Sequence, residues 1–470
     1  MNREILRLAL PNILSNVSVP LISSFDTALM GGLSAVHIAA VGLGSMAINI
    51  IYWNLNFLRM STTGLTAQAF GRGEEEAQLQ TLWRAGAVAL GLGILVLLIR
   101  PWLAGGSFWV LNLRADQLPL ISEYFHIRLW AAPAAVLQLV LLGWLFGRQN
   151  ARWPLYLTLI VNLTNLGLSY YFVRVAGYGI AGVAWGTVAA QYVGLIVGLA
   201  MVITVVRRLT AVRLSTVVRR ITVVVRRIVS APKRRNFVGR LSAKPTTTIP
   251  WANFFSLNRD IFLRTLCLSL SFIFFYNRAN ALDVAAATVS ANVILLQLVN
   301  WLSYGTDGFA YAAESLVGKY AGAGEPKALR RVVRLIFYWG MGLAGVYALV
   351  YGVGGRGLLG LFTADAPLVL VTAVRYLPTL VVFCLLATPC YLLDGIFVGL
   401  TAARDMRQTM LIALAGYLVA YYSVGQHFGN GGLWGSLLLF MVLRGVLLAR
   451  RLPSAYVPHH IHDPDRPDGG

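Results

Sequence analysis

The stretch PNILSNVSVPLISSFDTALMGG, residues 11–32, reads as a membrane-spanning helix that contains two prolines and one carboxylate. A charge in the hydrocarbon core costs several kcal/mol by most estimates, so intramembrane carboxylates usually face a cavity or a partner. Asp26 is therefore the candidate ion-coupling residue, and the alternative is a structural carboxylate that caps or bridges helices. Pro11 and Pro20 each remove a backbone hydrogen-bond donor, which makes them candidate helix-bending residues.

The whole chain has the composition of a membrane protein. Of its 470 residues 57% are hydrophobic and 12% charged, whereas soluble proteins carry about 25% charged residues. Apolar blocks of about 20 residues recur, the length that spans ~30 Å of hydrocarbon. These blocks predict an all-α membrane protein with twelve transmembrane helices: 8–31, 38–64, 81–103, 122–147, 154–174, 181–206, 258–280, 284–316, 332–354, 369–400, 407–425 and 431–450.

The two halves of the chain repeat each other in order. ILRLAL (5–10) matches FLRTLC (262–267), and GVAWG (182–186) matches GGLWG (431–435). Six spans per half is an even number, so both halves enter the membrane in the same direction and form two parallel six-helix lobes, with a substrate cavity expected between them. The predicted division is a first lobe at 1–206, a basic cytoplasmic linker at 207–256, a second lobe at 257–452 and a disordered tail at 453–470.

Basic residues set the orientation and mark the linker. Lys and Arg are concentrated on the side of the membrane that both termini share, which predicts that both termini lie in the cytoplasm. The expected location of the protein is the inner (cytoplasmic) membrane of the cell. Residues 207–250 are rich in Arg and contain no acid. Arg208, Arg219 and Arg226 fall on one face of a helix, so this segment is a candidate for contact with the anionic inner leaflet. A solvated linker is the alternative, and no nucleic-acid-binding pattern accompanies the charge.

Several motifs resemble those of the multidrug and toxic compound extrusion (MATE) family. These are ILRLALPNILSNVSVPLISSFDTALMGGL (5–33), LNRDIFLRTLC (257–267), SYGTDGFAYAAESLVGK (303–319) and LDGIFVGLTAARDMR (393–407), and two of them are similar to the DinF (DNA-damage-inducible protein F) branch. The resemblance implies twelve helices in two lobes, efflux of organic and usually cationic compounds in exchange for H⁺ or Na⁺, proton coupling through the first-helix Asp26 and bending at the first-helix proline. Ser169 stands where archaeal relatives have Asp, so a two-carboxylate relay with helix five is not expected.

Other polar and aromatic residues in the predicted spans are candidates for the cavity. Asn162 and Asn165 lie three apart and are placed to hydrogen-bond Asp26, with interhelical packing as the alternative. Asp307 and Glu314 share one helix face, where we expect a network with Arg or Tyr neighbours. Arg264 follows Asp260 by four residues, which predicts a local ion pair or an interfacial arginine. The remaining candidate cavity residues are Asp394, Tyr52 and Trp53.

The predicted function is ion-coupled antiport, with H⁺ favoured over Na⁺ as the coupling ion. No GxxxxGK[ST] motif occurs, which argues against direct ATP drive. No catalytic residue, metal site or cofactor is expected, and the expected partners are small organic substrates and the bilayer, with the chain a monomer. Two alternatives stay open. One is a lipid-linked oligosaccharide flippase, for which Arg59, Arg128 and Arg444 could supply the cationic cavity that a diphosphate needs. The other is a membrane-embedded enzyme, which is disfavoured because the histidines are scattered along the sequence rather than placed in a motif with a nucleophile.

Overall fold

The computed structural model describes residues 1–31, 35–110, 118–230, 250–282, 287–363 and 366–455, without the side chains of 19–28, 30–31, 35–39, 109–110, 209–230, 282 and 454–455. The described chain is almost entirely helical. Its α-helices are α1 (Asn2–Gly31), α2 (Ala35–Leu55), α3 (Phe57–Arg72), α4 (Glu75–Leu98), α5 (Arg100–Val110), α6 (Leu118–Arg128), α7 (Ala132–Gly147), α8 (Arg152–Tyr170), α9 (Gly179–Ser230), α10 (Trp251–Leu282), α11 (Ala287–Gly322), α12 (Pro326–Phe362), α13 (Pro367–Arg375), α14 (Leu377–Gly399), α15 (Ala403–Ser423) and α16 (Gly429–Ala455).

Each of the twelve predicted spans corresponds to one helix or to two helices separated by a short break. The divided spans are α2–α3, α4–α5, α6–α7 and α13–α14, and the breaks are one to three residues long. By length and composition alone, seven segments of the described chain qualify as membrane spans. The remaining predicted spans are helical as well, but they contain more polar residues or lack described side chains.

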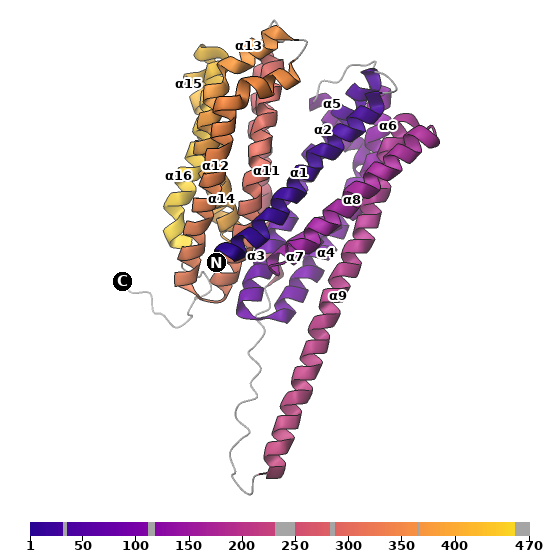
Figure 1. The fold of residues 1–470 in the computed structure, drawn as a ribbon, viewed down its shortest axis with the longest axis vertical. Coiled ribbons are helices and arrows are strands. Elements are labelled where there is room, and N and C mark those ends of the chain that lie inside the picture. Colours follow the sequence, from indigo (N-terminus) through magenta and orange to yellow (C-terminus); the bar gives the residue numbers. More distant parts are fainter. Residues whose placement is uncertain (32–34, 111–117, 231–249, 283–286, 364–365, 456–470) are drawn as a thin grey trace.

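The helices form two groups that meet at one end. Figure 1 shows α1–α9 on one side and α11–α16 on the other, diverging toward α5, α6 and α13 and converging where the N-terminus lies. At this closed end α3 packs against α4 and α7 of its own half and also against α11 and α14 of the other half. The buried apolar cluster there draws on both halves, for example through Leu58, Phe309 and Ile396. The two halves therefore share one core at the closed end.

The sequence repeat is visible in the backbone of two equivalent turns. α3 ends before Gly73, which has φ of 72°, and α11 ends before Gly324, which has φ of 70°. The residues that follow, Glu74 and Glu325, donate their backbone N–H to carbonyls five residues earlier, at 2.9 and 3.0 Å. This is the glycine-based C-cap that ends many helices, and its occurrence in both halves supports a common origin for them.

The closed end depends on glycines that let backbones approach. A Cβ atom on Gly71 of α3 would overlap the carbonyl oxygen of Lys319, and one on Gly322 of α11 would overlap that of Gln68. The Gln68 Nε2 donates a hydrogen bond across the halves to the carbonyl oxygen of Gly399, at 3.1 Å. Small residues at helix interfaces are the usual means of close packing in membranes, and here they bring α3 and α11 together.

A partly exposed ion pair adds to the same contact and gives a first prediction. Glu4 of α1 accepts hydrogen bonds from Lys319 Nζ at 3.2 Å and from the Tyr320 hydroxyl at 3.1 Å. Partial burial raises the pKa of Glu4, but the hydrogen bond and charge of Lys319, together with the Tyr320 hydroxyl, lower it by more, so the pKa lies below its ordinary value of 4.5. Because the folded pKa is depressed, the contribution to stability is present above about pH 4.5 and is lost as the pH falls through the folded value.

We expect Glu4→Gln to lower the free energy of unfolding by only ~0.5 kcal/mol at neutral pH, since the pair is partly solvent-exposed. The difference should be lost at an acidic pH below the lowered pKa of Glu4, where the wild-type carboxyl is protonated. Thermal unfolding of the wild-type and Glu4→Gln proteins at the two pH values measures how the stability difference between them changes with pH. An equal difference at both pH values would show that the ionised carboxylate is not the stabilising group.

The basic segment begins as a continuation of α9. The predicted span ends at 206, but α9 continues to Ser230, and Figure 1 shows this extension running on past the closed end, away from the body. Arg208 is exposed, whereas the side chains of Arg219 and Arg226 lie outside the described residues, as do residues 231–249 and the tail after 455. Contact of 207–250 with the inner leaflet and the division of the chain into four segments stay predictions. The helix α10 begins at Trp251, six residues before the predicted start of the second lobe.

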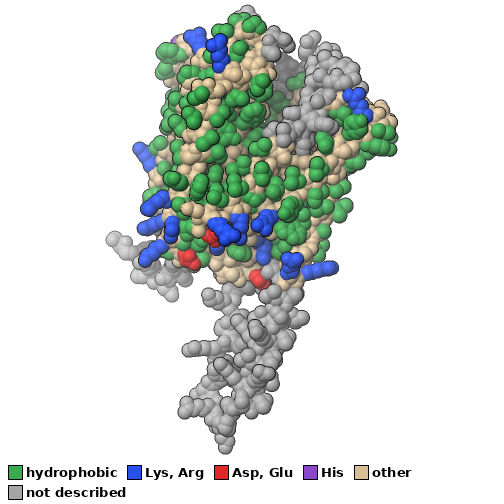
Figure 2. All heavy atoms as spheres, viewed as in Figure 1, with side chains coloured by type: hydrophobic (Ala, Val, Ile, Leu, Met, Phe, Trp, Pro, Cys, Tyr) green, Lys and Arg blue, Asp and Glu red, His purple; other side chains and the backbone are tan. Residues whose placement is uncertain are grey.

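The surface matches a protein that sits in a bilayer. Figure 2 shows hydrophobic side chains over the middle of the body and Lys and Arg side chains gathered at its lower edge, near the closed end. Exposed apolar side chains on the outer helices include Leu163, Ile196 and Leu349. A contiguous exposed apolar band of this kind marks a membrane-facing surface.

Candidate functional site

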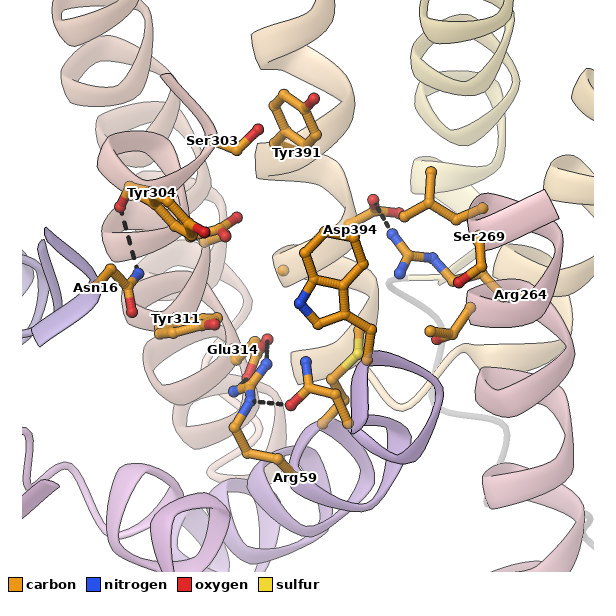
Figure 3. Close-up of a pocket in the computed structure, with 18 of the residues that line it drawn as sticks. Asn16, Arg59, Arg264, Ser269, Ser303, Tyr304, Tyr311, Glu314, Tyr391 and Asp394 are labelled. Atoms are coloured by element: carbon orange, nitrogen blue, oxygen red, sulfur yellow. Dashed lines mark hydrogen bonds and ion pairs between the residues drawn. The ribbon is translucent and has the colours of Figure 1, made fainter. Parts of the chain in front are cut away.

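A polar cavity of about 290 Å³ lies between the two halves, above the closed end. It is lined from the first half by α1, α2 and α3 and from the second half by α10, α11 and α14 (Figure 3). Its wall combines aromatic side chains, amides, hydroxyls and five charged residues. The charged lining residues are Arg59, Arg264, Asp307, Glu314 and Asp394.

The floor of the cavity is a buried ion pair that joins the halves. Arg59 of α3 donates from Nη1 and Nη2 to the two carboxylate oxygens of Glu314 on α11, at 2.9 and 3.2 Å. Its Nε donates to Asn56 Oδ1 at 3.0 Å, and its guanidinium lies 4.1 Å from the ring centre of Tyr311. Arg59 is 4% exposed and Glu314 2%. Two-point pairing with a carboxylate and stacking on an aromatic ring are geometries that suit arginine.

The second charged group is built within the second half. Asp394 of α14 accepts hydrogen bonds on Oδ2 from Arg264 Nη2 of α10 and, at 2.6 Å, from Arg444 Nη2 of α16. Figure 3 shows Arg264 and Asp394 facing each other at one side of the cavity. Arg444 lies behind Asp394, 1% exposed, with its Nη1 against Met441 Sδ at 3.2 Å. Two guanidinium groups thus share one carboxylate.

Asp307 is the third carboxylate of the cavity and differs from the other two. It lines the cavity from α11 and is half-buried. Within the part of the chain that the structure describes, no residue forms a hydrogen bond or an ion pair with Asp307. Intramembrane carboxylates usually face a cavity or a partner, and Asp307 faces the cavity.

The predicted site residues fall into two places. Asp307, Asp394 and Trp53 line the cavity. Asn162 donates to Ser18 Oγ of α1 at 2.8 Å, and Asn165 donates to Thr187 Oγ1 of α9 at 2.8 Å, so both lie within the first half and outside the cavity lining.

The remaining predicted residues lie on α1 and α2. The Asn162 contact places α8 against α1, the helix of Asp26, but the side chains of Asp26 and Pro20 lie outside the described residues. Pro11 is half-buried in α1. Tyr52 does not line the cavity, and its buried hydroxyl has no hydrogen-bond partner among the described residues.

One local pairing predicted from sequence spacing is wrong, and the network predicted for Asp307 and Glu314 is present at Glu314 but not, among the described residues, at Asp307. Arg264 pairs with Asp394, whereas Asp260 accepts from Arg407 Nη1 at 2.5 Å and from Arg259. The helix spacing allows Arg264 and Asp260 to meet, but the tertiary fold offers each a better partner. The expected network around Glu314 is present through Arg59 and Tyr311. Arg264 was not expected in the cavity, and Arg59 was expected there only under the flippase alternative. No local signal reveals their pairing, because their carboxylate partners are far away in the sequence.

These observations define a multi-pass membrane protein made of two related halves with a charged cavity between them, the architecture of a transporter. The MatE family model matches residues 11–171 and 261–423, one stretch in each half. Because the match covers more than half of the chain, the chain belongs to the MatE family of transporters.

Relatives and solved structures agree with this assignment. The chain is 34% identical over 454 residues to "DNA damage-inducible protein F" of Escherichia coli (strain K12), which covers 95% of the chain and 91% of the relative. It is 28% identical over 207 residues to "Probable multidrug resistance protein NorM" of Rhizobium meliloti, 44% of each. These matches confirm the resemblance to the family and to its DinF branch.

The fold is shared with solved MATE structures at low sequence identity. One, titled the outward-facing conformation of a multidrug resistance MATE family transporter of the MOP superfamily, has a TM-score of 0.80 at 17% identity, covering 97% of this chain and 96% of the other. A MATE structure in the bent conformation has a TM-score of 0.78 at 16% identity, covering 96% and 95%. The predicted class, twelve transmembrane helices in two six-helix lobes, is confirmed.

Proposed function

We propose that this chain exports organic compounds, mainly cationic ones, across the cytoplasmic membrane in exchange for H⁺ by alternating access. The observation that carries the proposal is the cavity between the halves, which is closed at one end by the α3–α11 contact. It contains Asp307, a carboxylate without an ion-pair partner among the described residues. The basic side chains near the closed end favour a cytoplasmic location for that end. The structure would then correspond to the state that receives the coupling ion from outside.

Alternating access requires the closed end to open and the other end to close. The polar contacts across the closed end are discrete, namely the Arg59–Glu314 pair and single hydrogen bonds such as Gln68 to Gly399. They accompany the glycine-based backbone packing and the apolar core that the halves share there. Such an interface can separate as a unit, which is how two bundles rock about a central site. Exchange follows if substrate and proton compete for a carboxylate in the cavity or in α1.

The flippase alternative is less well supported by this cavity. A diphosphate headgroup needs several uncompensated cations, whereas Arg59 is fully paired with Glu314. Arg128 does not line the cavity, and its Nε donates to the Tyr124 hydroxyl at 3.2 Å. Arg444 is paired with the carboxylate of Asp394. The cavity offers at most a single surplus positive charge.

The test of the proposal is dye transport into inside-out membrane vesicles with one gradient imposed at a time. We expect a pH gradient alone to drive accumulation of a cationic dye and a sodium gradient alone to drive none. Vesicles without the protein provide the control. Transport that requires sodium and ignores the pH gradient would overturn the assignment of the coupling ion, and absence of transport under both gradients would overturn antiport.

Asp26→Asn separates the coupling role of that residue from a structural one. We expect the variant to be present in the membrane at wild-type level, to bind dye and to lose efflux driven by the pH gradient, because the amide cannot carry a proton. Asp307→Asn is the matched variant in the cavity. Wild-type efflux by a well-expressed Asp26→Asn protein, together with loss in Asp307→Asn, would transfer the coupling role to Asp307.

A further inference from the structure

We infer that the cavity is a two-ended site for zwitterionic organic compounds, with their anionic group bound at Arg264 and their cationic group at Asp307. This inference rests on the proposed function, since it names the substrate class of the same cavity. It extends that function from simple cations to compounds that carry both charges.

The charged groups around the cavity differ in whether their charge is balanced by a neighbour. The Arg59–Glu314 pair is neutral, and all three nitrogen groups of that arginine already have acceptors. Its charge is therefore balanced within the pair, and it offers no surplus charge to a ligand. The remaining charged groups are the cluster of Arg264, Asp394 and Arg444 on one side and Asp307 on the other.

The cluster carries one surplus positive charge. Both guanidinium groups contact the same oxygen of Asp394, and no other described carboxylate pairs with either of them. Arg444 is covered on all sides, but Arg264 lines the cavity. The surplus charge therefore faces the cavity through Arg264.

Arg264 also has unused donors. Within the described chain its only hydrogen bond runs from Nη2 to Asp394, although a guanidinium carries five N–H groups. The Nε is buried without an acceptor, and the side chain is 8% exposed. Buried donors without acceptors are rare because they cost free energy. The Nη1 group also has no acceptor among the described residues, and a carboxylate or sulfonate on a ligand in the cavity supplies one through the charge-assisted bonds that arginine forms well.

Asp307 supplies the opposite end. It has no ion-pair partner among the described residues, and it lines the same cavity from α11, facing the space that Arg264 enters from α10. A simple cation bound there neutralises Asp307 but leaves the surplus charge of the Arg264 cluster unpaired. A zwitterion pairs with both Asp307 and Arg264 and brings no net charge into the low-dielectric space. Its binding therefore compensates the desolvation of both charged groups, whereas a simple cation compensates only that of Asp307.

The walls between the two ends suit a flat organic body. Trp53, Phe272, Tyr304 and Tyr391 line the cavity on several sides. Aromatic walls with a few oriented polar groups are the usual composition of small-molecule sites, and rings stack favourably on such side chains.

The test compares two fluorescent probes that differ in one charge. A rhodamine with a free benzoate is a zwitterion at neutral pH, and its methyl ester is a cation with the same ring system. Fluorescence polarisation with the purified full-length protein measures both affinities. We expect the wild-type protein to bind the zwitterion about tenfold more tightly, which corresponds to one well-formed charged contact.

Variants assign the preference to its residues. Arg264→Gln leaves the Arg444–Asp394 pair intact and neutral, so we expect the zwitterion to fall to the affinity of the ester while the ester is unaffected. Asp307→Asn should weaken both probes. Arg259→Gln is the matched control, because this arginine lies on the same helix but is 62% exposed and pairs with Asp260. It should leave both affinities unchanged.

Two results would overturn the inference. One is equal affinity of the wild-type protein for both probes, which needs no variant and is therefore independent of folding defects. The other is an unchanged ratio of affinities in a folded Arg264→Gln protein. The proposed function fails separately: if the preference depends on Arg264 but neither probe is moved by a pH gradient in vesicles, the binding site stands and antiport does not.

Discussion

Alanine at Gly71 is expected to abolish export while leaving the protein folded in the membrane. Its Cβ would overlap the carbonyl oxygen of Lys319 and lie 2.8 Å from the Ala323 nitrogen, both backbone atoms that cannot move aside like a side chain. Overpacking of this kind costs ~1–3 kcal/mol. A cost of about 3 kcal/mol changes the ratio of two conformations by roughly a hundredfold, so the closed end should open and stay open.

The matched control is Gly86→Ala on α4, because a Cβ at Gly86 meets nothing within 4 Å. Both substitutions replace a helical glycine by the best helix former, so they differ only in the clash. Efflux measures function, and spin labels at the exposed positions Arg72 and Lys327 measure separation of the closed end. An unchanged label distance in Gly71→Ala, with normal efflux, would show that the closed end does not depend on this contact.

The fold was largely predictable because its main determinants are local or repeat along the chain. Apolar blocks of spanning length located all twelve spans, and the matching turns at Gly73 and Gly324 belong to the repeat seen in the sequence. The end of α9 was missed for a physical reason. A change from apolar to basic residues ends a membrane span but need not end a helix, and no Gly or Pro occurs between 206 and 230 to interrupt it.

The cavity was less predictable because its contacts join distant parts of the chain. Intramembrane position identified Asp307 and Asp394 as candidates, since carboxylates are costly in lipid. Their different environments could not be predicted, because Arg264 and Arg444 reach Asp394 from helices 130 and 50 residues away. Spacing within one helix suggested Asp260 for Arg264 instead. Local rules predict which pairs can meet, and the packing of helices decides which pairs do.

Glu314→Gln is expected to be the most destabilising single substitution of a charged residue in the cavity. It leaves Arg59 buried at 4% exposure without a counter-ion, and breaking a buried pair in this way typically costs ~3–5 kcal/mol. Thermal unfolding of the purified protein and its yield in the membrane measure the loss. The exposed pair Arg72–Glu74 is the control, with an N–O distance of 2.8 Å, and Glu74→Gln should cost less than ~1 kcal/mol.

The double variant Arg59→Met with Glu314→Leu distinguishes the cost of an orphaned charge from the value of the pair. Replacing both partners by apolar residues of similar size is often neutral for stability, so we expect the double variant to regain most of the stability that Glu314→Gln loses. The coupling energy from the complete cycle, which also needs Arg59→Met and Glu314→Leu alone, should be large because the residues are in direct contact. A loss in the double variant equal to the sum of the losses in Arg59→Met and Glu314→Leu would mean that the two residues stabilise the protein independently. Recovery of stability without recovery of efflux would assign the pair to the opening and closing of the closed end, since a bidentate salt bridge between α3 and α11 must form in one state and break in the other.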